Sequence, residues 1–146
     1  MRRLLLVLFL LLSPALARDF VLLGESKVCY CNPDVIRQIN HAWRESENGN
    51  GNLGTLEVGF RVDYIDGKIV VGPLIYGEKG YSVDIPINTT TIAIVHTHPN
   101  GGKAVPSKED RASPVPNYIL SRVGEYVTDP ATRTYHQIFL SMGSCR

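Results

Sequence analysis

The sequence has few cysteines, almost no net charge and no long apolar segment after its first residues. Its 146 residues include only three cysteines, and the formal net charge at pH 7 is +1. Phosphate binding favours a surface rich in lysine and arginine, so nucleic acids are not expected as partners. A membrane-spanning helix needs about 20 apolar residues, and no segment of this chain supplies them. The length suits one globular domain.

The first seventeen residues are typical of a secretory signal peptide. Two arginines precede the apolar run Leu4–Leu12, and Ala15-Leu16-Ala17 has the small residues of a cleavage site. We expect cleavage after Ala17 rather than a retained membrane anchor, because the run is too short to span a bilayer comfortably. Residues 18–146 would then form a single domain, secreted or periplasmic in a bacterial host. Without the two arginines its formal net charge becomes −1.

The cysteines allow one disulfide and one unpaired thiol. A secreted chain meets an oxidising compartment, where Cys145 would pair with Cys29 or with Cys31. The spacing of Cys29 and Cys31 is also compatible with a metal site, although no companion ligand lies near them in the sequence. We prefer the disulfide over a metal site at Cys29 and Cys31.

The rest of the chain predicts helices and strands in one α/β domain. Asn32 can cap a helix over residues 32–47, Pro33 suits its first position, and apolar residues recur there at helical spacing. A loop rich in glycine and asparagine follows. Strands are expected over residues 56–64, 68–76, 81–87 and 91–98 and in the segments 117–130 and 133–140, with a short helix over 106–112. A turn is expected at Asp66-Gly67.

Two histidines at the end of an apolar strand are the strongest functional feature. Residues two apart on a strand point to the same side, so His96 and His98 would direct both imidazoles to one point. Ser107 and Asp110 would share one face of the short helix, which a glycine-containing loop allows to fold back. Two imidazoles and one carboxylate would leave a fourth position open, as catalytic zinc requires. Zinc lowers the pKa of a bound water to about 7.

Each half of this pattern has a simpler structural interpretation. Histidine pairs are common on protein surfaces, and Ser-x-x-Asp is typical of a capped helix start. Both patterns after an apolar strand favour a metal site. His41 and His136 lack neighbouring ligands in the sequence, so we interpret them as packed or surface residues.

The residues His96-Thr97-His98-Pro99 and Ser107-x-x-Asp110 resemble the JAMM motif of the JAB1/MPN/Mov34 metallopeptidases. The likeness extends over about residues 32–140 and is greatest to the JAB-like domains of bacterial polymorphic and RHS toxins and of small secreted bacterial proteins. It implies a JAB1/MPN-type fold, similar to the cytidine-deaminase-like architecture, with a mixed sheet flanked by helices.

The resemblance also implies roles for individual residues. His96, His98 and Asp110 would bind zinc, and Ser107 would support the oxyanion that forms during hydrolysis. The family's general acid/base is a glutamate on an early strand after the first helix, and Glu57 fits that place, whereas Glu45 lies at the end of the helix. The implied activity is cleavage of a peptide or isopeptide bond in a peptide or protein substrate. Removal of ubiquitin is not implied. The deubiquitinases of this family are cytoplasmic, whereas this chain begins with a predicted signal peptide.

Other functions are weighed against this one. A zinc deaminase lacks support because its His-x-Glu and Pro-Cys-x-x-Cys patterns are absent from the sequence. A metal-dependent nuclease toxin would suit the likeness to toxins, but the chain has no basic surplus. The remaining alternative is a non-catalytic binding module with the same fold, which has no physical need for Glu57 and Ser107 beside three ligands.

Overall fold

The computed structural model describes residues 32–48, 56–78, 82–98 and 104–138. The predicted signal peptide and the three cysteines lie outside the described residues, so their cleavage and pairing stay predictions. Within the described ranges, no helix is long and apolar enough to cross a membrane.

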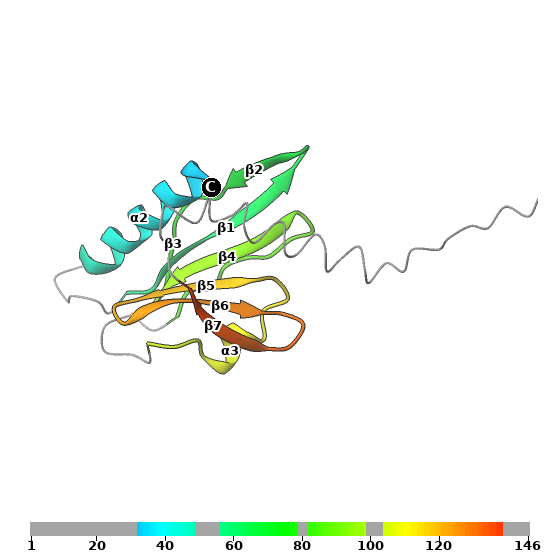
Figure 1. Ribbon diagram of the computed structural model, residues 1–146. Helices are drawn as coiled ribbons and strands as arrows, with labels where there is room; N and C mark the ends of the chain where they lie inside the picture. The colour runs from blue at the N-terminus through cyan, green and yellow to red at the C-terminus, as the bar shows by residue number, and fades with distance from the viewer. Residues whose placement is uncertain (1–31, 49–55, 79–81, 99–103, 139–146) are drawn as a thin grey trace, which may run out of the picture.

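The described strands form one mixed sheet. In chain order, the elements are α2 (Pro33–Asn48), β1 (Val58–Ile65), β2 (Lys68–Val71), β3 (Ile75–Tyr76), β4 (Thr91–Thr97), α3 (Lys108–Arg111), β5 (Asn117–Ser121), β6 (Gly124–Asp129) and β7 (Thr134–Ile138). The sheet runs β2-β1-β4-β5-β6-β7, as Figure 1 shows, and β3 also pairs with β1. Strands β4 and β5 are parallel, while the other neighbours are antiparallel. The coarse prediction of an α/β fold with a mixed sheet is confirmed.

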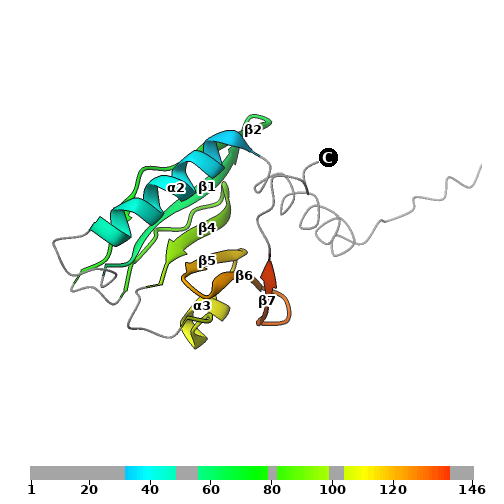
Figure 2. The same cartoon turned by 60° about the vertical axis from the view of Figure 1, so that its left-hand side comes forward.

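Helix α2 begins where the sequence predicts. The Asn32 side chain accepts hydrogen bonds from the backbone amides of Asp34 and Val35, at 2.9 and 3.3 Å. These bonds satisfy amide groups that the first turn of a helix leaves without partners. The apolar stripe then buries Val35 and Ala42 against the sheet. Figure 2 shows α2 along one face of the sheet, with α3 away from it, beside β5 and β6.

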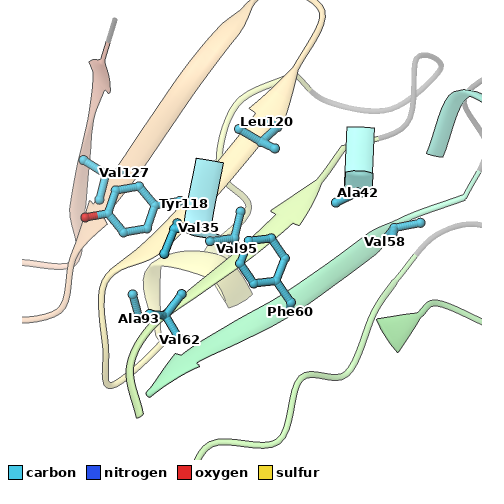
Figure 3. Close-up of a cluster of buried hydrophobic side chains, with 10 residues drawn as sticks. All are labelled: Val35, Ala42, Val58, Phe60, Val62, Ala93, Val95, Tyr118, Leu120 and Val127. Atoms are coloured by element: carbon cyan, nitrogen blue, oxygen red, sulfur yellow. The ribbon is translucent and has the colours of Figure 1, made fainter. Parts of the chain in front are cut away.

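Alternate residues of the central strands form the core beneath α2. The buried cluster, labelled in Figure 3, contains Val35, Ala42, Val58, Phe60, Val62, Ala93, Val95, Tyr118, Leu120 and Val127. Because successive strand residues point to opposite faces, the residues between them lie on the other face of the sheet. Gly59, His96 and Asn117 are among these, so three strands contribute residues to the face opposite α2.

Phe60 is the largest fully buried side chain among the described residues, and truncating it should weaken the fold strongly. We expect Phe60→Ala to lower the free energy of unfolding by about 3–5 kcal/mol, because it removes apolar contacts and leaves a cavity. Urea denaturation followed by circular dichroism measures this change. Val123→Ala is the control, since Val123 is 63% exposed and its loss should change stability by about 0.5 kcal/mol or less. Equal effects of the two variants would contradict the assignment of the core.

Two strand predictions were wrong. Residues 68–76 form two strands, β2 and β3, because Pro73 cannot donate to a ladder and Gly72–Leu74 leave the strand conformation. The strand expected over 81–87 is not formed at residues 83–87, because the Val83 amide donates to the Glu57 carboxylate at 3.0 Å and Pro86 has no amide hydrogen.

The other predicted helices and strands are confirmed within the described residues, with small changes at their ends, whereas most of the predicted glycine-rich and asparagine-rich loop lies outside them. Strand β4 ends at Thr97 rather than at His98, and α3 lies within the predicted short helix. Asp66 and Gly67 have φ angles of 50° and 78°, the left-handed conformations that a two-residue hairpin turn requires.

Candidate metal centre

Strand β4 brings the two predicted histidine ligands together. His96 lies on the face opposite α2, and His98 follows the strand's last residue with its amide hydrogen-bonded to the Leu120 carbonyl at 2.8 Å. The two imidazole centroids are 5.0 Å apart, and the residues are only 4% and 9% exposed. The alternation of side chains along β4 therefore produces the convergence that the sequence predicted.

A capping box positions Asp110. The Ser107 hydroxyl oxygen accepts from the Asp110 amide at 3.0 Å, and the Ser107 amide donates to the Asp110 carboxylate at 2.6 Å. This reciprocal pair is a standard way to begin a helix, and it holds the carboxylate at the first turn of α3. Because α3 lies in the connection between the parallel strands β4 and β5, that turn reaches the histidines at the end of β4.

The Asp110 carboxylate contacts both imidazoles. Its Oδ1 lies 3.2 Å from His96 Nε2, and its Oδ2 lies 3.2 Å from His98 Nε2. Burial raises the pKa of the Asp110 carboxyl, but hydrogen bonds from His96 and His98 outweigh it and hold that pKa far below its usual range. Asp110 is therefore a carboxylate at neutral pH, the form in which it would bind a metal.

Together these three residues could hold a metal ion. One ligand atom from each of His96, His98 and Asp110 can be chosen so that all lie within 4.8 Å of one another. Two ligands bound at the usual 2.0–2.1 Å from a tetrahedral zinc would be about 3.3 Å apart. Each imidazole nitrogen lies 3.2 Å from a different oxygen of the Asp110 carboxylate, close to that ligand spacing. Nitrogen and oxygen donors of these types are ordinary zinc ligands.

Glu57 lies beside the three candidate ligands, just before β1. Its carboxylate accepts a hydrogen bond from the Val83 amide. This bond holds the Glu57 side chain at the edge of the cavity that His96 and His98 also line. Burial raises the pKa of the Glu57 carboxyl above the ordinary 4.5, and this outweighs the opposing influence of His96 and His98. A higher pKa makes a carboxylate a better acceptor of protons near neutral pH.

The candidate ligands open into one cavity of about 480 Å³. Its lining consists of Glu57, Ser82, Val83, Asp84, Ile85, Ile87, Ile94, His96, His98, Ser107, Glu109, Asp110, Ser113 and Asn117. Gly59 allows this arrangement, because a Cβ there would lie 2.6 Å from Ile85 Cδ1 and 2.9 Å from His96 Cβ. The structure therefore places the five predicted site residues around one cavity.

Sequence reasoning missed the structural roles of two buried polar residues, one at the centre and one on the opposite face of β4. Asn117 at the start of β5 is 2% exposed, and its Oδ1 lies 3.0 Å from His96 Nδ1. Thr97 is fully buried on the side of β4 that faces α2, and its Oγ1 accepts a hydrogen bond of 3.0 Å from the amide of Val58, the residue after Glu57. In the sequence, Asn117 was visible only as a polar residue at the start of the apolar run that follows α3. Its partners could not be identified without the register of β4 and β5.

The other two histidines do not line this cavity. His41 is exposed on α2, with its Nε2 3.7 Å from Glu45, and His136 is exposed on the edge strand β7. Both positions agree with the interpretation of these histidines as packed or surface residues.

Three comparisons with known proteins complete the description of the site. No protein-family model matches the chain, and neither does any curated protein or solved structure. The assignment of the centre consequently depends on the residues themselves: two imidazoles and a carboxylate at ligand spacing, with a glutamate beside them in a cavity.

Proposed function

We propose that the chain is a zinc-dependent hydrolase of the JAMM type, which cleaves a peptide or isopeptide bond. The observation that carries this proposal is the position of Glu57 in the same cavity as three residues that could together hold a metal ion. A structural zinc site is normally closed by four protein ligands. Three ligands beside a carboxylate and an open cavity match the pattern of a hydrolytic site instead.

The chain's own residues supply distinct parts of the proposed chemistry. His96, His98 and Asp110 would hold zinc, which when bound acts as a Lewis acid and makes water nucleophilic near neutral pH. Glu57 would accept the proton of the attacking water and pass it to the leaving amine. The Ser107 oxygen accepts the Asp110 amide, so its own hydrogen can still be donated toward an oxyanion in the cavity.

The cavity supports a substrate larger than water. Ligand pockets usually have volumes of about 300–1,000 Å³, a range that includes the value found here. Val83, Ile85, Ile87 and Ile94 form an apolar part of the lining, where a side chain of a peptide substrate could pack. Asp84 and Glu109 add acidic groups, and among the described residues the lining includes neither lysine nor arginine. This composition argues against a nuclease, because phosphate would meet like charge.

A non-catalytic zinc-binding module is the competing function. It would use the same three ligands but would have no role for a partly buried Glu57 held by the Val83 amide. Turnover of a substrate would distinguish the hydrolase from the non-catalytic module. The predicted secretion by a bacterium remains part of the proposal and concerns residues outside the described ranges.

Removal and return of zinc provide the direct test. We expect the purified chain to cleave peptides in a mixed library, to lose at least about 90% of that activity after chelation, and to recover it with zinc, because a site of two imidazoles and one carboxylate can release and rebind the metal. Mass spectrometry of the library identifies the cleaved bonds. Magnesium is the control metal, because it prefers oxygen ligands and should not restore activity. Zinc binding without any cleavage would favour the non-catalytic module.

A further inference from the structure

The side chain of Asn117 connects two of the three candidate ligands. Its Oδ1 lies 3.0 Å from His96 Nδ1, and its Nδ2 lies 3.4 Å from both the backbone carbonyl and the Oδ1 of Asp110. The residue itself is fixed by its place in β5, where its amide donates to Thr128 Oγ1 at 3.1 Å. Both polar ends of a buried amide therefore contact the candidate metal centre.

These contacts determine which nitrogen of His96 carries a hydrogen. A backbone carbonyl can only accept, so the Asn117 group that faces Asp110 must be the NH₂ group. The Asn117 oxygen then faces His96, and an oxygen without hydrogen can only accept. His96 Nδ1 must consequently be the donor. A hydrogen on Nδ1 gives the neutral ring the tautomer that a metal needs, with its lone pair on Nε2, whereas without a metal Nε2 can instead donate to the Asp110 carboxylate that it faces.

We infer that Asn117 is a positioning residue, which selects the zinc-binding tautomer of His96 and holds that imidazole and Asp110 in one arrangement. The inference rests on the proposed zinc centre. Metal-bound histidines commonly donate their other ring hydrogen to such a partner, and losing the partner lowers metal affinity about 10–100-fold. Here the side-chain amide of Asn117 on β5 would hold two ligands that lie on other elements, His96 on β4 and Asp110 on α3.

Zinc affinity, measured by competition with a chromogenic chelator, tests this role in three variants of the full chain. Asn117→Leu removes both contacts and should bind zinc about 10–100-fold more weakly. Asn117→Asp keeps an acceptor for His96 Nδ1 and should stay within about tenfold of the natural chain. Thr91→Val is the matched control, because it removes a buried hydrogen bond of 2.8 Å to Asp63 from the other end of β4. Its zinc affinity should be unchanged.

The three variants separate positioning from general support of the fold. A merely structural role predicts that Asn117→Asp, with a buried charge, binds zinc no better than Asn117→Leu. That result would overturn the inference, as would natural affinity in Asn117→Leu or an equal loss in Thr91→Val. Thermal unfolding without zinc verifies that each variant folds.

A second measurement does not need the metal. Nitrogen-15 NMR of the zinc-free chain at about pH 8 should show a protonated Nδ1 in His96, and in Asn117→Leu the hydrogen should move to Nε2, which still faces the Asp110 carboxylate. An unprotonated Nδ1 in the natural chain would overturn the inference even if zinc binds. A protonated Nδ1 in a chain that never binds zinc would overturn the proposed function but support selection of the tautomer.

Discussion

His96→Ala and Asp110→Ala should each reduce the zinc content of the purified chain from about one ion per molecule to near zero. Each change leaves only two protein ligands, too few for a stable zinc site in a protein. The Asp110 change also removes the carboxylate that contacts both imidazoles at 3.2 Å. Elemental analysis after purification without added zinc, alongside the natural chain, measures the effect.

Three control variants test whether the loss is specific. His41→Ala and His136→Ala should retain zinc, because both histidines are exposed and neither lines the cavity. Ser107→Ala removes the cap of α3, which is worth about 1 kcal/mol, but keeps all three ligands, so it should also retain zinc. If the natural chain takes up no zinc even when it is supplied, residues 95–110 are only a strand end, a loop and a helix cap.

The Ser107 variant is needed because Asp110 has two functions in the structure. Its Oδ2 accepts the Ser107 amide and thereby completes the capping box, and the same atom lies 3.2 Å from His98 Nε2. The structural and the metal-binding interpretations of Ser-x-x-Asp are therefore compatible. The helix start fixes the carboxylate, and the fixed carboxylate faces the histidines.

The features that the sequence predicted well depend on neighbouring residues. His96 and His98 share a side because strand side chains alternate, and Ser107 and Asp110 pair because a first helical turn brings them together. The start of α2 follows from Asn32 and the stripe that includes Val35 for the same reason. Such patterns need no knowledge of the rest of the fold.

The features that were missed depend on contacts between distant segments. Asn117 is 21 residues from His96 in the chain, and the parallel register of β4 and β5 brings them together. Residues 83–87 had a strand-like composition, but the Val83 amide bonds to the side chain of Glu57, 26 residues earlier. Both outcomes follow from tertiary pairing, which overrides local preference.

Glu57→Gln should abolish hydrolysis while leaving the metal in place. Glutamine has nearly the same shape but cannot accept a proton from water, and loss of a general base typically reduces the rate about 10²–10⁴-fold. Zinc content should stay at the natural value, because Glu57 is not among the three candidate ligands. Parallel measurement of peptide cleavage and bound zinc separates this change from His96→Ala, which should lose both.

Glu45→Gln is the matched control for this prediction. It makes the same chemical change at the end of α2, where Glu45 pairs with His41 and Tyr76 outside the cavity, so cleavage should continue at the natural rate. Full activity in Glu57→Gln would show that Glu57 is not the base and that its position beside the centre has another cause. Loss of zinc in Glu57→Gln would instead make it a fourth ligand, and a site closed by four protein ligands is structural rather than catalytic.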